Sequence, residues 1–150
     1  GMATVAIVGA GPAGASAGYH LASRGHRVTL LDRAAFPRPK VCGDWIAEGS
    51  VQALAASGLA PDELERAAGE HVVLGGSRVA SPRGETSEVR HARRAYCIPR
   101  LVFDDLLLKR ALRAGCTFEK EDVRELRPGR RGRLDAFDHV IVCGVLPDVV

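Results

Sequence analysis

The residues best suited to chemistry lie near the amino terminus. Gly9, Gly11 and Gly14 have the spacing G-x-G-x-x-G, and Asp32 follows further along the chain. In this spacing the first glycine permits a tight turn, the second lets backbone approach a pyrophosphate, and the third lets a helix pack closely on a strand. A carboxylate at Asp32 can accept hydrogen bonds from ribose hydroxyls and disfavours a 2′-phosphate, so NADP is not expected at this site. The glycine motif alone does not distinguish NAD from FAD.

The elements around the motif predict a βαβ unit. Residues 4–8 form an uninterrupted apolar run, typical of a strand buried on both faces of a parallel sheet. A helix is expected from Pro12 to about Arg24, ended by Gly25, and residues 27–31 form the next strand. The expected apolar face of this helix consists of four residues: Ala13, Ala17, Leu21 and Ala22.

The rest of the chain predicts an α/β fold of Rossmann-like type, with a mainly parallel sheet and a small antiparallel meander. Residues 71–97 form the meander, with a hairpin connection at Gly75-Gly76-Ser77 and further strands at 87–91 and 95–98. The other expected elements are a loop over 33–48, helices over 47–57, from 61 and over 101–114, and strands at 116–118, 123–126 and 139–143. The predicted apolar face of helix 101–114 consists of Phe103, Leu106, Leu107, Ala111 and Leu112.

Composition limits the alternatives. The 150 residues suit a single domain, and no apolar run approaches the roughly 18–20 residues of a membrane-spanning helix. The net charge of +3 is mild, and the arginine-rich run 127–133 is interpreted as a solvated loop, since it has no aromatic residue to stack on bases. No nucleic-acid partner is therefore expected. The four cysteines form no C-x-x-C pair, so we expect reduced thiols and a cytoplasmic location.

Three segments resemble a large flavoprotein group that includes aromatic-ring hydroxylases, flavin-dependent halogenases and geranylgeranyl reductases. The first is residues 5–32, VAIVGAGPAGASAGYHLASRGHRVTLLD. The second and third, FPRPKVCGD at 36–44 and YCIPRLVFDDLL at 96–107, are similar to segments of geranylgeranyl reductase-like proteins. The resemblance implies an FAD-binding fold, FAD as the cofactor, NAD(P)H as the reductant and oxidoreductase activity of the reductase, monooxygenase or halogenase type.

The same resemblance implies a set of cofactor-binding residues and assigns no catalytic residue or metal ligand. Asp32 would hold the adenosine ribose, Arg100 would lie along the phosphate–ribitol side, and the backbone of Val123 would face the adenine. The full set is Gly9, Gly11, Pro12, Ala13, Gly14, Asp32, Arg33, Arg38, Cys42, Gly43, Asp44, Arg100 and Val123.

One part of the family pattern has no counterpart. Members of the group carry a Gly-Asp pair after a later strand, whereas residues 143–146 read Cys-Gly-Val-Leu and lack the acid. We therefore expect a single FAD/NAD(P)-binding domain over 3–150, with 71–97 as an antiparallel insertion and the substrate domain largely missing. The function expected is that of a shortened FAD-dependent oxidoreductase. The alternative is a dinucleotide-binding module, for FAD or NAD, without catalysis of its own.

Overall fold

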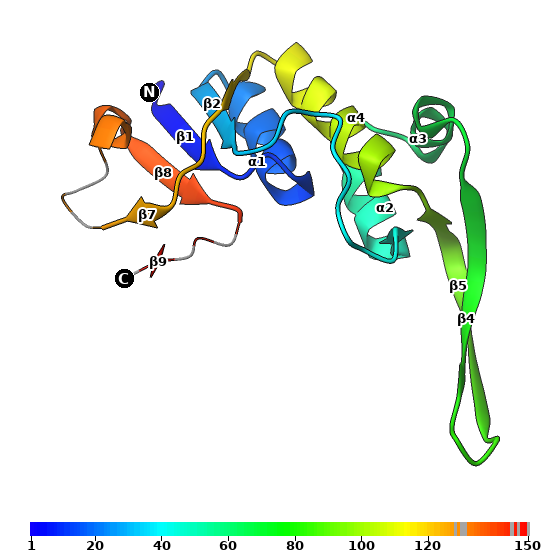
Figure 1. The fold of residues 1–150 in the computed structure, drawn as a ribbon. Helices are drawn as coiled ribbons and strands as arrows, with labels where there is room; N and C mark the ends of the chain where they lie inside the picture. Colours follow the sequence, from blue (N-terminus) through cyan, green and yellow to red (C-terminus); the bar gives the residue numbers. More distant parts are fainter. Residues whose placement is uncertain (128, 130–131, 145, 147, 150) are drawn as a thin grey trace. The chain divides into compact units, whose positions relative to one another are not determined.

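The computed structural model describes residues 1–127, 129, 132–144, 146 and 148–149 (Figure 1). The chain forms two compact units. The first unit comprises residues 1–39 and 103–150, and the second comprises residues 40–102. The expected single domain over 3–150 stays a prediction.

A four-stranded parallel sheet organises the first unit, in the order β6-β2-β1-β8 (Figure 1). The bounds of its strands are β1 Thr4–Val8, β2 Arg27–Asp32, β6 Thr117–Lys120 and β8 His139–Val142. The apolar run of β1 lies between two partners, as its lack of polar alternation predicts. This sheet confirms the predicted α/β fold of Rossmann-like type.

A different element packs against each face of this sheet. Helix α1, Pro12–Ala22, lies over Ile7 and Leu30, while Ala6, Val8 and Leu31 pack with Leu134 of the short 3₁₀ helix η1, Gly132–Ala136. The predicted apolar face of α1 is partly wrong, because Ala13 is exposed, whereas Ala17, Leu21 and Ala22 are half-buried. The buried residues of α1 are Gly14, Ala15 and Gly18. Their small size, rather than their hydropathy, lets the helix approach the strands.

Helix α4, Arg100–Arg113, matches the predicted helix within one residue. The predicted apolar face is partly wrong, because Leu112 is exposed and Leu108 is buried. The unit boundary falls within α4, before Phe103. In the first unit α4 runs beside α1, where the Arg110 guanidinium lies 3.6 Å from the centre of the Tyr19 ring.

An acid in α4 is fully buried. The Asp104 side chain has 0% exposure, and its Oδ2 lies 2.7 Å from Nη1 of Arg38, in the loop after β2. The Arg38 guanidinium also stacks over Phe36, whose ring meets Phe118 edge-on. This ion pair ties the loop to α4 within the first unit.

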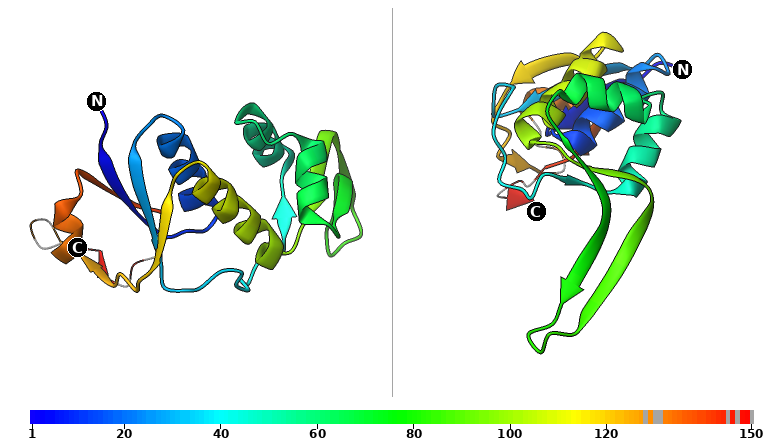
Figure 2. Two further views of the ribbon diagram at one scale, coloured as in Figure 1. Left: turned by 90° about the horizontal axis from the view of Figure 1, so that it is seen from above. Right: turned by 90° about the vertical axis from the view of Figure 1, so that its right-hand side faces the viewer.

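The second unit combines two helices with an antiparallel sheet of order β3-β5-β4. Helices α2 and α3 lie beside the base of the β4–β5 hairpin, and the hairpin extends away from them (Figure 2). The bounds are β3 Trp45–Ile46, α2 Glu48–Ala56, α3 Pro61–Ala68, β4 Val72–Ala80 and β5 Thr86–Cys97. The core of this unit includes Ile46, Val51, Leu54, Leu64, Tyr96 and Ile98.

The predicted hairpin connection at Gly75-Gly76-Ser77 is wrong. These residues lie inside β4, and the turn is at 81–85, where the Ser81 N–H donates to the Glu85 carbonyl at 2.8 Å and Gly84 has a φ of 85°. Gly76 is needed for another reason, since a Cβ there would lie 2.4 Å from the Val89 carbonyl oxygen. The sequence predicts two strands, at 87–91 and 95–98, but the structure has a single strand, β5, in this region. Its pairing with β4 has an irregularity in register between Leu74 and Gly76.

Two further short strands belong to the first unit. Strand β7, Glu125–Leu126, pairs in parallel with β9, Asp148–Val149, and starts two residues later than predicted. In the arginine-rich run, Arg133 forms ion pairs with Glu119 and Glu121. Pro128, Arg130 and Arg131 of that run lie outside the described residues.

The buried ion pair predicts a stability effect. Replacing one partner of a buried pair leaves the other uncompensated, so Asp104→Asn should lower the free energy of unfolding by about 3 kcal/mol, measured by urea denaturation. The matched control is Asp105→Asn, which breaks the Asp105–Lys109 pair at 2.6 Å on the same helix. Lys109 is exposed, so this change should cost about 0.5 kcal/mol or less. Equal costs for the two variants would contradict the assigned role of Asp104.

Candidate cofactor-binding site

Packing inside the first unit explains two of the three motif glycines. Gly9 has a φ of 102°, and a Cβ there would lie 2.8 Å from the carbonyl oxygen of Cys143. A Cβ on Gly14 would lie 1.7 Å from the carbonyl oxygen of Gly9. Both positions therefore require glycine for the fold itself, whether or not a ligand binds.

Gly11 differs from its neighbours. It precedes α1 with φ −69° and ψ −170°, an extended conformation open to any residue. No side chain caps α1 at this end, its first turn carries no acid, and Pro12 occupies the start of the helix. The positive end of the helix is thus left without a negative side chain of its own. Exposed Ala13 belongs to the same first turn.

Asp32 fastens the glycine loop to the second strand. Its Oδ2 accepts the Ala10 N–H at 2.9 Å, and its Oδ1 accepts the Ala34 N–H at 3.0 Å. Each carboxylate oxygen retains capacity for a further hydrogen bond. Sequence reasoning missed this positioning role, although it placed Asp32 correctly at the end of β2. Arg33, which follows it, is exposed.

Two other predicted site residues of the first unit have structural contacts. The Arg38 guanidinium is engaged by Asp104 and Phe36. Val123 precedes β7 and packs, half-buried, against the core that contains Val8 and Leu134. The predicted cofactor contacts of Arg38 and Val123 stay predictions.

The second unit brings together Cys42, Asp44 and Arg100. Asp44 has a φ of 58°, uncommon for a residue with a side chain. Its carbonyl accepts the Ile98 N–H at 2.9 Å, and its Oδ1 accepts the Arg100 N–H at 3.2 Å. These bonds hold the 42–44 loop against the start of α4. Gly43 is exposed, and a Cβ there would meet nothing within 4 Å.

The cysteines differ in acidity because their surroundings differ. The pKa of the exposed Cys42 thiol is lowered, chiefly by a hydrogen bond from the Asp44 backbone and then by the Arg100 guanidinium. Burial raises the pKa of Cys116 to about 11 and also raises that of Cys143. Cys42 therefore has a larger thiolate fraction at neutral pH than Cys116 or half-buried Cys143.

Comparison with known protein families identifies the chain. Residues 2–128 match the family described as the FAD binding domain, and this match covers most of the chain. The chain belongs to this family. FAD is therefore the cofactor that the family match supports, in agreement with the sequence prediction.

Individual relatives of this FAD binding domain include enzymes of two classes. The chain is 37% identical over 133 residues to digeranylgeranylglycerophospholipid reductase 1 of Methanopyrus kandleri, a match that covers 87% of this chain and 32% of the relative. It is 31% identical over 132 residues to conditioned medium factor receptor 1 of Dictyostelium discoideum, covering 81% and 26%. Among solved structures, the myxobacterial chondrochloren halogenase CndH, an FAD-dependent halogenase, matches with a TM-score of 0.71 and 31% identity, covering 85% and 31%. The matches thus span about a quarter to a third of the length of these relatives.

The helices in the described part of this FAD binding domain include none with the length and apolar character to span a bilayer.

The acidity of Cys42 predicts selective alkylation. Iodoacetamide at neutral pH should modify Cys42 faster than Cys116 and Cys143, as followed by peptide mass spectrometry. Arg100→Met should shift the pH–rate profile of Cys42 to higher pH, because the guanidinium that lowers its pKa is removed. Arg90→Met, on exposed β5, is the control and should leave the profile in place. An unshifted profile in Arg100→Met would show that the guanidinium does not act on the thiol.

Proposed function

We propose that the chain provides the FAD-binding part of a flavin-dependent oxidoreductase, with the pyrophosphate at the amino-terminal end of α1. The observation that carries the proposal is Gly11. Gly11 has an extended backbone conformation that does not require glycine, whereas Gly9 and Gly14 are required by conformation or packing. A glycine at this position is what close approach of a pyrophosphate to the backbone needs.

The donor groups in the first unit fit the adenosine diphosphate half of FAD. The uncapped first turn of α1 offers N–H groups and partial positive charge to phosphate oxygens. The Asp32 carboxylate, at the end of the neighbouring strand, can accept hydrogen bonds from the ribose hydroxyls while it holds Ala10. The cofactor contacts of Arg100 and of the 42–44 loop are proposed on the sequence resemblance alone.

The class of reaction follows from the relatives as a proposal. The similarity to digeranylgeranylglycerophospholipid reductase 1, at 37% identity, extends over 87% of this chain, so we propose reduction of a polyprenyl double bond. FAD, when bound, supplies the redox chemistry, and NAD(P)H would serve as the reductant. The similarity to a halogenase keeps halogenation as a second candidate.

All four cysteines are free thiols, which supports the proposed cytoplasmic location.

Flavin titration of the full chain tests this function. FAD should bind saturably, with quenching of its fluorescence, and anaerobic NADH or NADPH should then bleach the visible flavin band. Binding without bleaching would favour the dinucleotide-binding module without catalysis. Absence of binding to both FAD and NAD would overturn the proposed phosphate site.

The second motif glycine gives a direct prediction. Gly11→Val should abolish FAD binding, because a branched side chain keeps phosphate oxygens away from the backbone. The far-ultraviolet circular dichroism spectrum should remain that of the unmodified chain. Gly49→Ala is the control, since Gly49 lies in α2 with open space around its Cβ position. Wild-type affinity in Gly11→Val would place the phosphates elsewhere.

Asp32 gives a second prediction. Asp32→Asn should weaken FAD binding by about 1–3 kcal/mol, the scale of a hydrogen bond to a charged group. Asparagine has one acceptor oxygen, which can keep the Ala10 N–H bond of the glycine loop while the Ala34 N–H bond is lost, so affinity for inorganic pyrophosphate should be unchanged. Isothermal titration of both ligands separates the ribose contact from the loop geometry. Equal losses for FAD and pyrophosphate would assign Asp32 to the loop alone.

A further inference from the structure

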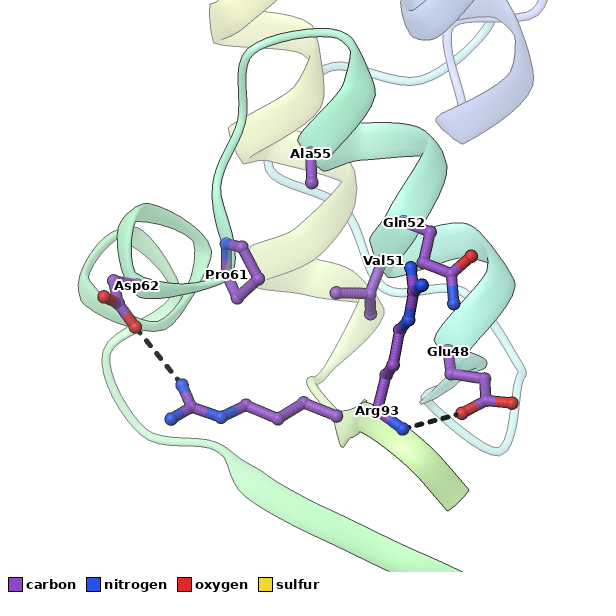
Figure 3. Close-up of a pocket in the computed structure, with 8 residues that line it drawn as sticks. Glu48, Val51, Gln52, Ala55, Pro61, Asp62 and Arg93 are labelled. Carbon is purple, nitrogen blue, oxygen red and sulfur yellow. Dashed lines mark hydrogen bonds and ion pairs between the residues drawn. The ribbon is translucent and has the colours of Figure 1, made fainter.

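The second unit contains a cavity away from the glycine motif. It has a volume of about 460 Å³ and lies among α2, the start of α3 and β5 (Figure 3). Its apolar wall consists of Val51, Ala55 and Pro61, and Val51 is only 4% exposed. This volume falls within the range of about 300–1,000 Å³ that small-molecule sites occupy.

Most charges around the cavity already have partners. The Arg94 guanidinium lies 3.2 Å from Asp62 and 2.8 Å from Glu65. Glu65 also accepts the hydroxyl of buried Tyr96 at 2.5 Å, which holds this group in place. The Glu48 carboxylate accepts the backbone N–H of Arg93 at 3.1 Å.

The remaining charged group in the lining of the cavity is the Arg93 guanidinium. Figure 3 shows the Arg93 side chain rising from β5 beside Gln52 and Val51 of α2, with Asp62 on the opposite side of the cavity. Among the described residues, no carboxylate forms an ion pair with this guanidinium. A planar fork of N–H donors thus lies beside an apolar wall, which is the combination that recognises a carboxylate on an apolar body.

The flanking acids restrict the ligand further. Glu48 and Asp62 both line the cavity and would repel a second negative charge. Di- and triphosphates are therefore disfavoured relative to a monoanion. We propose that this cavity binds a small carboxylic acid with a compact apolar body, its carboxylate on Arg93 and its body against Val51, Ala55 and Pro61. The site is independent of the proposed flavin function.

Benzoate is the probe for this site. Titrated into the full chain, benzoate should cause saturable amide shifts at Val51, Ala55 and Arg93 in NMR spectra. Benzylamine, which has a similar body and opposite charge, should cause none. Arg93→Gln should weaken benzoate binding about tenfold or more, as loss of a charge-assisted hydrogen-bond pair implies. The backbone bond from residue 93 to Glu48 does not depend on this side chain.

Two further variants complete the test. Arg90→Gln, an exposed arginine on the same strand, should leave the benzoate affinity within about twofold, a small fraction of the loss expected at Arg93. Ala55→Leu should fill the cavity and abolish binding, and helix α2 should be retained because leucine is nearly as good a helix former as alanine. Wild-type affinity in Arg93→Gln or Ala55→Leu, equal binding of benzylamine, or no saturable binding would overturn the proposal. Because benzoate can be titrated without FAD, failure of flavin binding does not affect the outcome.

Discussion

The close approach of α1 to the parallel sheet is the constraint on which the first unit depends. Gly14 lies so near the Gly9 carbonyl that a Cβ has no space, and Gly18 faces Leu30 and Cys116 with only 3.2 Å to a hypothetical Cβ. This contact sets the depth of the helix on the sheet and the course of the loop before it. The first turn of α1 consequently follows directly from the carboxyl end of β1, the edge of a parallel sheet at which ligands bind.

Asp32 couples this geometry to ligand chemistry. Its carboxylate reaches from the end of β2 to the Ala10 N–H, so two neighbouring strand ends are joined by one side chain. The bonds to the Ala10 and Ala34 N–H groups fix the orientation of the carboxylate. For the proposed ribose contact, a carboxylate held in this way loses less entropy on binding. The same carboxylate thus serves both the loop geometry and the proposed ribose contact.

The βαβ unit, the glycine loop and the helix over 101–114 were predictable from the sequence, because apolar periodicity, glycine stops and motif spacing are local signals. The packing face of α1 was not, since its small buried residues carry little hydropathy signal. The hairpin turn was misplaced because Gly75-Gly76 resembles a turn, whereas Gly76 serves close strand approach. Asp104 and Arg38 are 66 residues apart, and the cavity on α2 draws its lining from three separate elements. Only the folded chain brings such groups together.

The β4–β5 hairpin has a consequence for self-association. Both of its faces are largely exposed, including Val79 and Val89, and β4 is an edge strand of its sheet. Strand β3 pairs with the Tyr96 and Cys97 end of β5, away from the hairpin turn. Exposed strand edges are templates for pairing with another chain, and charged side chains oppose it. The ion pair of Arg78 and Glu88 places charged side chains on the β4–β5 hairpin and thus opposes the formation of intermolecular sheets by its exposed edges.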